Sequence, residues 1–166
     1  MQSFFDDLEC MIKIMEDPQN GLCTTEADKR QIHCFKVARI RQLHFNGYNL
    51  DDKAKTLQEI ETLISHEEDV DTKATLYFFA ADLLREKGEN EKVLAKVEEG
   101  LQACQGASDL SRLLSFKCST LEKTGGLGLK EATMKLQEYI DKHELDGMAT
   151  AQNLLVDYSA MRKFVI

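Results

Sequence analysis

The glycine-rich stretch Gly125-Gly126-Leu127-Gly128-Leu129-Lys130 has the residue types that surround phosphate in nucleotide-binding loops. Such a loop requires the spacing GxxxxGK[ST] between a strand and a helix, so that backbone N–H groups converge on the phosphates. That spacing is absent here, and no strand-like run precedes the glycines. We therefore predict that this stretch is a turn between two helices.

His33, Cys34 and the upstream Cys23 carry the nitrogen and sulfur atoms that bind zinc in proteins. Neighbouring residues of a helix point about 100° apart, and no second ligand pair follows at a spacing typical of zinc sites. The acidic run Glu67-Glu68-Asp69 lacks the pattern of a calcium loop. We therefore predict no metal, no cofactor and no enzymatic activity. A Cys–His pair brought together by the fold is the remaining catalytic alternative.

The 166-residue chain has a net charge of −8, and residues 51–100 carry most of the excess of acidic over basic side chains. A nucleic-acid-binding surface needs cations that replace the counterions of phosphate, so this charge argues against nucleic-acid binding. No apolar run approaches the roughly 20 residues that cross a bilayer, so we expect no membrane segment. The composition is typical of a globular protein with a hydrophobic core.

Five cysteines are an odd number without paired spacing, and the acidic N-terminus does not resemble a secretory signal. This pattern indicates reduced thiols and predicts a cytoplasmic or nuclear protein. Cys104 and Cys118 fall on apolar helical faces, where we expect small buried side chains.

Apolar residues recur at helical spacing along the chain, and no segment shows sustained alternation of apolar and polar residues. The only proline is Pro18, so long uninterrupted helices are permitted. Thr25 and Asp28 have the spacing of a capping box, and Ser108 is a candidate N-cap. We predict an all-α fold of about eight helices, at residues 3–16, 26–46, 51–65, 71–87, 90–104, 108–123, 129–143 and 149–164.

The connections are short, so consecutive helices are expected to be antiparallel neighbours. We pair the second helix with the third, the fourth with the fifth and the sixth with the seventh. The turn glycines Gly47, Gly88 and Gly126 then recur at an interval typical of helical-hairpin repeats. The first and last helices have no evident mates, so the domain is either complete in contact with a partner or the N-terminal segment of a longer solenoid.

Residues 74–107 resemble a tetratricopeptide repeat, which is a helical hairpin with small residues where its helices cross. The positions that carry the resemblance are Tyr77, Ala80, Ala81, Leu84, Gly88, Val93, Val97, Gly100 and Leu101. The stretch departs from the motif at four places. In the first helix Ala replaces a large aliphatic residue. In the second helix Val replaces both the small residue and the aromatic residue, and the closing proline is missing. The hairpins at 36–64 and 109–140 fit more loosely, and other stacked-hairpin solenoids, such as the helical part of PCI-type scaffold subunits, are the alternative. The resemblance implies a superhelix whose first helices line a concave groove for peptides or partner helices.

That implied groove would display the side of each first helix that points away from the second helix. The residues placed there are the candidate partner-binding residues Lys36, Arg39, Thr75, Phe78, Asp82, Arg85, Arg112 and Lys117. Several cations in a groove would bind an acidic peptide, because Arg donates paired hydrogen bonds to carboxylates. Tyr77, Phe78 and Phe79 are consecutive, so one aromatic ring must point away from the main helix seam. The alternative is that each candidate is an ordinary solvated side chain.

The sequence thus predicts one helical-repeat domain over residues 1–166, a right-handed superhelix of antiparallel hairpins. Its expected function is that of a non-catalytic protein–protein interaction scaffold, a subunit of a larger complex that binds a peptide or helical segment of another protein. The alternative is a structural homo-oligomer assembled through the terminal apolar helices. Further contacts are expected through the apolar residues near the two ends, Phe4, Phe5, Phe164, Val165 and Ile166.

Overall fold

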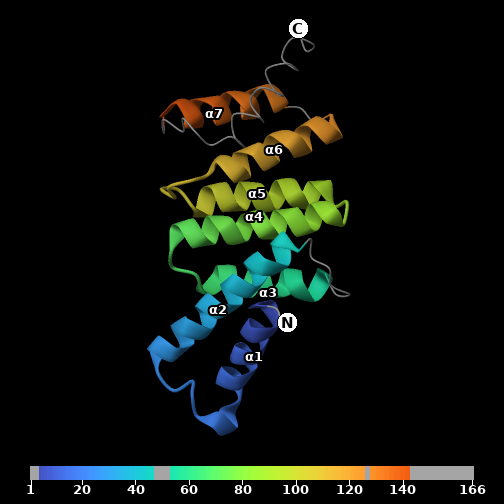
Figure 1. Ribbon diagram of the computed structural model, residues 1–166. Helices are drawn as coiled ribbons and strands as arrows, with labels where there is room; N and C mark the ends of the chain where they lie inside the picture. The colour runs from blue at the N-terminus through green and yellow to red at the C-terminus, as the bar shows by residue number, and fades with distance from the viewer. Residues whose placement is uncertain (1–3, 47–52, 126–127, 143–166) are drawn as a thin grey trace. The chain divides into compact units, whose positions relative to one another are not determined.

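A computed structural model of the protein describes residues 4–46, 53–125 and 128–142. These residues form seven α-helices and one 3-10 turn, and none of them lies in a strand, so the predicted all-α class is confirmed (Figure 1). The elements are α1 (Phe4–Glu16), η1 (Pro18–Asn20), α2 (Glu26–Phe45), α3 (Lys53–His66), α4 (Val70–Glu86), α5 (Asn90–Ala103), α6 (Ser111–Thr124) and α7 (Leu129–Lys142). The predicted eighth helix, at 149–164, lies outside the described residues.

The chain divides into two compact units, Met1–Glu67 and Glu68–Ile166. In the described residues, no helix is both long enough and apolar enough to cross a membrane.

The first unit contains α1, η1, α2 and α3. Leu8 and Ile12 of α1 are buried, and α1 packs against α2 more extensively than α3 does. The expectation that the first helix has no mate is therefore wrong. Hydrophobic periodicity identifies the buried side of α1 but does not specify which neighbouring helix covers that side.

The start of α2 is fixed by a capping box. The Thr25 hydroxyl accepts a hydrogen bond from the Asp28 N–H (3.1 Å), and the Asp28 carboxylate accepts one from the Thr25 N–H (2.8 Å). Two N–H groups without helical partners are satisfied in this way. The sequence prediction for this helix end is confirmed.

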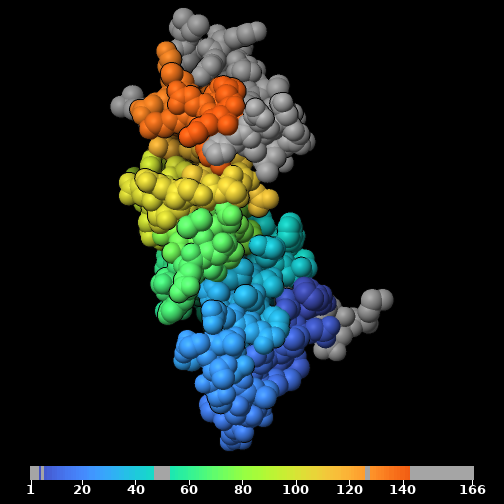
Figure 2. Space-filling model, turned by 90° about the vertical axis from the view of Figure 1, so that its left-hand side faces the viewer, coloured from blue at the N-terminus to red at the C-terminus, as the bar shows by residue number. Residues whose placement is uncertain are grey.

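The second unit contains α4, α5, α6 and α7, and successive helices run in opposite directions (Figure 1). Each helix packs against the next, and α4 also packs against α6. In the space-filling view the green atoms of α4, the yellow to gold atoms of α5 and α6, and the orange atoms of α7 form successive bands (Figure 2). Helix α4 is the most enclosed, with nine buried side chains that include Tyr77, Phe79, Ala80 and Ala81.

Gly88 ends the α4 helix and turns the chain into α5. Its φ angle of 75° lies in the left-handed region, which glycine adopts without the steric cost that other residues have. The N–H of Glu89 donates to the carbonyl of Leu84 (3.1 Å), which closes the turn. The predicted hairpin at residues 74–104 therefore forms around this glycine.

Ser108 is not an N-cap, which corrects the sequence prediction. Helix α6 begins at Ser111, and Asp109 accepts hydrogen bonds from the Ser111 N–H (2.9 Å) and hydroxyl. The Ser108 N–H instead donates to the Asp71 carboxylate, and its carbonyl accepts from the Tyr139 hydroxyl (3.1 Å). These tertiary hydrogen bonds hold Ser108 before the helix and outweigh its local capping preference.

Candidate functional site

Four of the predicted site residues meet on neighbouring sides of α4 and α6, together with Phe116. The Phe78 and Phe116 rings pack edge to face, with centroids 5.2 Å apart and an interplanar angle of 80°. The guanidinium of Arg85 lies over the Phe116 ring, 4.5 Å from its centroid, and that of Arg112 lies over the Phe78 ring at 5.7 Å. We call this cation–ring–ring–cation arrangement, with the Asp82 carboxylate beside it, the α4–α6 stack.

Helical spacing explains how these side chains reach one another. Phe78, Asp82 and Arg85 are four and then three residues apart on α4, so they share one side of that helix. Arg112 and Phe116 are four residues apart on α6 and share one side in the same way. The two sides come together because α4 packs on α6.

The three consecutive aromatic residues of α4 divide as helical geometry requires. Tyr77 is buried against α5, where its hydroxyl donates to Glu99, and Phe79 is fully buried. Phe78 is half-buried and contacts Phe116 of α6. It is therefore the ring that points away from the α4–α5 seam.

The two guanidinium groups have different electrostatic surroundings. Asp82 is buried, with a side chain 7% exposed, and forms an ion pair with Arg85 one helical turn later. Arg112 is exposed and lies over an aromatic ring. A guanidinium over a ring face gains electrostatic attraction while its edge N–H groups stay available as donors. The stack can therefore present oriented donors to an anion.

Two other predicted residues of the second unit have different contacts. The Thr75 hydroxyl donates to the Asp71 carbonyl one turn earlier (3.1 Å). Lys117 forms an ion pair with Glu98 of α5, so its charge is directed toward α5 and not toward the α4–α6 stack.

The two predicted cations of the first unit link its helices. Lys36 of α2 forms an ion pair with Glu16 of α1. Arg39 of α2 pairs with Glu9 of α1, at 3.0 Å, and with Glu59 of α3. Both side chains belong to the first unit and have carboxylate partners there, so neither is part of the α4–α6 stack.

Phe116 is the residue of the site that the sequence analysis missed. Its side chain is 6% exposed, and as an apolar residue on α6 it has the pattern of an ordinary core position. Its spacing of four residues from Arg112 was the available signal, since such a pair shares one helix side.

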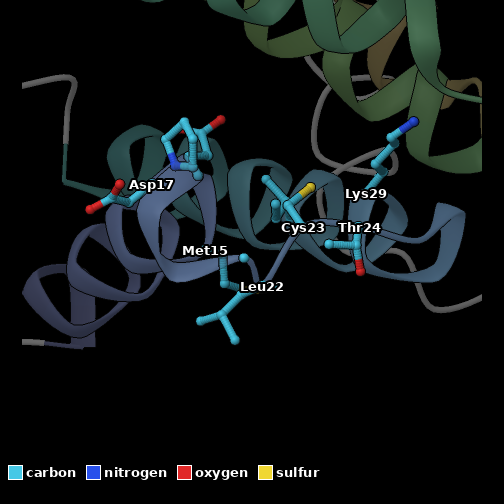
Figure 3. Close-up of a pocket in the computed structure, with 10 residues that line it drawn as sticks. Met15, Asp17, Leu22, Cys23, Thr24 and Lys29 are labelled. Atoms are coloured by element: carbon cyan, nitrogen blue, oxygen red, sulfur yellow. The ribbon is translucent and has the colours of Figure 1, made fainter.

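The first unit contains a hollow of about 560 Å³. It lies between the end of α1, the 3-10 turn and the start of α2, and Met15, Asp17, Leu22, Cys23, Thr24 and Lys29 contribute to its lining. The polar groups of Asp17, Thr24 and Lys29 point in different directions (Figure 3). Lys29 is also paired with Glu26, at 2.7 Å. The hollow therefore lacks the converging polar groups that fix a ligand.

Three residues with possible metal-binding atoms, His33, Glu67 and Asp69, have partners within the fold. His33 Nε2 lies 2.7 Å from a Glu67 carboxylate oxygen, and Asp69 accepts the Thr72 N–H at the start of α4. In the described parts of the chain, no group of three or more His, Cys, Asp and Glu side chains could hold a metal ion.

Two glycines of the glycine-rich stretch, Gly125 and Gly128, have positive φ angles at the end of α6 and just before α7. They turn the chain between these helices.

The apolar residues predicted for further contacts are described only in part. Phe4 is 64% exposed on α1. The side chain of Phe5 and residues 164–166 lie outside what the structure describes.

No model of a known protein family matches the chain, and none of the curated proteins or solved structures compared with it matches either.

Proposed function

We propose that the protein is a non-catalytic protein–protein interaction scaffold, and that the α4–α6 stack binds a segment of a partner protein. The observation that supports this proposal is the exposed Arg112 beside the half-buried Phe78 ring on two helices that pack together. Aromatic and arginine side chains in one patch contribute most of the binding energy in many protein interfaces. The stack offers both apolar contact and charged hydrogen-bond donors.

The proposal includes a tetratricopeptide-like solenoid arrangement of the helical hairpins. This arrangement is supported by the packing of α4 on both α5 and α6. In such a solenoid α4 and α6 are the first helices of successive hairpins, and first helices line a common surface. A surface of this kind suits an extended peptide or a helix better than a small molecule, because small ligands need enclosure on most sides.

Selection of short random peptides on the immobilised full chain, from a display library, tests the proposal. Enriched peptides are synthesised with a fluorophore, and their affinities are measured by anisotropy. We expect Phe78→Ala to weaken binding about tenfold or more, because an aromatic anchor in an interface commonly contributes over 1.4 kcal/mol.

Phe45→Ala is the matched control, because Phe45 is a phenylalanine 74% exposed on α2 and distant in sequence from the stack. Its peptide affinities should equal those of the wild type. Chemical denaturation of both variants shows whether either change unfolds the chain, and Arg112→Gln is a second stack variant that removes only an exposed head group. The proposal is wrong if the library yields no binder, or if its binders are insensitive to both stack variants.

One observation favours homo-oligomerisation as a second function. Phe4, Met11 and Ile14 of α1 are 64%, 42% and 47% exposed, and their spacing puts them on one side of the helix. A second copy of the chain could cover this apolar side. Light scattering over the micromolar range should then show a concentration-dependent dimer that Met11→Ser with Ile14→Ser abolishes, and a constant monomer would eliminate this alternative.

A further inference from the structure

We propose that the α4–α6 stack binds one carboxylate of an acidic–apolar partner segment, with Arg112 as the anion-binding group and Arg85 as a positioning residue. This inference rests on the proposed function and adds the chemistry of the bound segment. The carboxylate is that of an Asp or Glu side chain, and the apolar residue beside it packs on Phe78.

Arg85 is assigned as a positioning residue because its charge is already compensated. Its guanidinium pairs with the buried Asp82 carboxylate and lies over the Phe116 ring, 4.5 Å from the centroid. An incoming carboxylate at Arg85 would meet a guanidinium whose charge the buried Asp82 already neutralises, so it would gain little attraction there. The Asp82–Arg85 pair instead fixes Phe116 from one side, and Phe116 supports Phe78 from the other.

Arg112 is the cation that remains for a ligand. In the described part of the chain no carboxylate lies within ion-pair distance of its guanidinium, which stacks on Phe78. The acidic residue one helical turn before it, Asp109, accepts hydrogen bonds from the Ser111 N–H and hydroxyl. The Asp109 carboxylate thus stabilises the start of α6. The planar guanidinium of Arg112 can donate two parallel hydrogen bonds to one carboxylate of a ligand.

The surroundings favour a singly charged group over a phosphate or a nucleic-acid backbone. One guanidinium balances one carboxylate, whereas a phosphate carries more charge at neutral pH and Asp82 lies beside the stack. The chain as a whole has a net charge of −8, so a polyanion would be repelled over a wider area. The half-buried Phe78 ring gives the neighbouring ligand residue an apolar surface.

The test uses the peptides selected on the wild-type chain, in matched pairs that differ by Glu→Gln or Asp→Asn at one acidic position. Affinities of both members are measured by fluorescence anisotropy for the wild type, Arg112→Gln and Arg85→Gln. We expect the neutral member to bind the wild type about tenfold more weakly, because a charge-assisted bidentate pair is lost. Arg112→Gln should abolish this difference, and Arg85→Gln should retain most of it.

Salt dependence gives a second readout that a merely structural role of Arg112 would not change. Added salt should lower the affinity of the acidic peptide for the wild type and should have little effect on its affinity for Arg112→Gln. The inference is overturned if the selected peptides carry no acidic residue, if both members of each pair bind equally, or if the difference persists in Arg112→Gln. In each of these cases binding that still depends on Phe78 leaves the proposed function standing. If no selected peptide depends on Phe78 or Arg112, the proposed function fails as well.

Discussion

Gly100 of α5 lies directly against Tyr77 of α4. A Cβ atom at position 100 would come within 2.9 Å of the Tyr77 Cβ and Cγ atoms and 3.2 Å of Leu113 of α6. Atoms so close to the Tyr77 backbone cannot move away unless α4 itself shifts. The glycine therefore sets how closely α4, α5 and α6 approach one another.

The variant Gly100→Ala is expected to destabilise the second unit. Alanine favours a helix over glycine by about 1 kcal/mol, but overpacking a close contact typically costs about 1–3 kcal/mol. We expect the cost of overpacking to dominate and the free energy of unfolding to fall by about 1 kcal/mol, as measured by urea denaturation. The matched control is Ala95→Gly, at an exposed position of α5, which isolates the effect of helix propensity. A Gly100→Ala variant that is more stable than the wild type would show that the helices do not approach this closely.

Tyr77 predicts a pH dependence of stability at alkaline pH. Burial, and then the hydrogen bond to Glu99, raise the pKa of Tyr77 to about 12 from its ordinary value of about 10. Between these values the native state retains a proton that the unfolded chain has released, so stability falls as pH rises. The contribution of Tyr77 is complete below pH 10 and is lost as pH passes 12.

The comparison with Tyr77→Phe isolates this effect, because every other titrating group is common to the two proteins. The stability advantage of the wild type should be largest below about pH 10 and should shrink toward pH 12. Denaturation curves at a series of pH values measure the advantage, and phenolate absorbance reports the ionisation of Tyr77. An advantage that stays constant across this range would mean that Tyr77 ionises equally in the folded and unfolded states.

Local signals in the sequence were sufficient to identify the seven described helices and some of their ends. Thr25 and Asp28 cap α2 as their spacing predicts, and Gly88 turns α4 into α5 with a positive φ angle. Such features depend on residues within one or two helical turns of each other. The capping preference of Ser108 was a wrong guide, because the Ser108 N–H donates to Asp71 and its carbonyl accepts from Tyr139, two residues distant in sequence.

The site depends on contacts between helices, which a single sequence does not specify. Three of the four candidates on α4, Phe78, Asp82 and Arg85, could be grouped because they share one helix side. The contact of Phe78 and Arg85 with Phe116 also requires α4 to pack on α6. The periodicity of α6 shows that Phe116 is apolar and does not show which ring it meets. In the same way, the pairing of Arg39 with carboxylates of two other helices could not be predicted from its position on α2.

Arg39 is expected to stabilise the first unit by linking its three helices. The variant Arg39→Met removes the cation that Glu9 of α1 and Glu59 of α3 share, and we expect α1–α3 to lose about 2 kcal/mol of stability. Lys13→Met is the control, because Lys13 also pairs with Glu9 but is 79% exposed, and exposed pairs contribute about 0–1 kcal/mol. Hydrogen exchange read by mass spectrometry reports the stability of these helices separately. Unchanged exchange in Arg39→Met, with weaker peptide capture, would support the earlier prediction that Arg39 binds the partner.

The reactivity of the cysteines reports the stability of each unit separately, since both units contain cysteines. Cys10 and Cys34 are exposed on α1 and α2, whereas Cys104 and Cys118 of the second unit are fully buried. Burial also raises the pKa of the Cys104 and Cys118 thiols, so a smaller fraction is present as the reactive thiolate. A short pulse of iodoacetamide should alkylate Cys10 and Cys34 first, with the modified sites identified by mass spectrometry.

Labelling of Cys104 and Cys118 then requires the second unit to open, so its rate should depend on the stability of that unit. Gly100→Ala should increase the labelling rate of both buried thiols and leave that of Cys10 unchanged, because Cys10 belongs to the first unit. Arg39→Met should leave the labelling of Cys104 and Cys118 unchanged. If Cys118 reacted as fast as Cys34 in the native wild-type protein, the packing of α6 against α5 and α7 would have to be wrong.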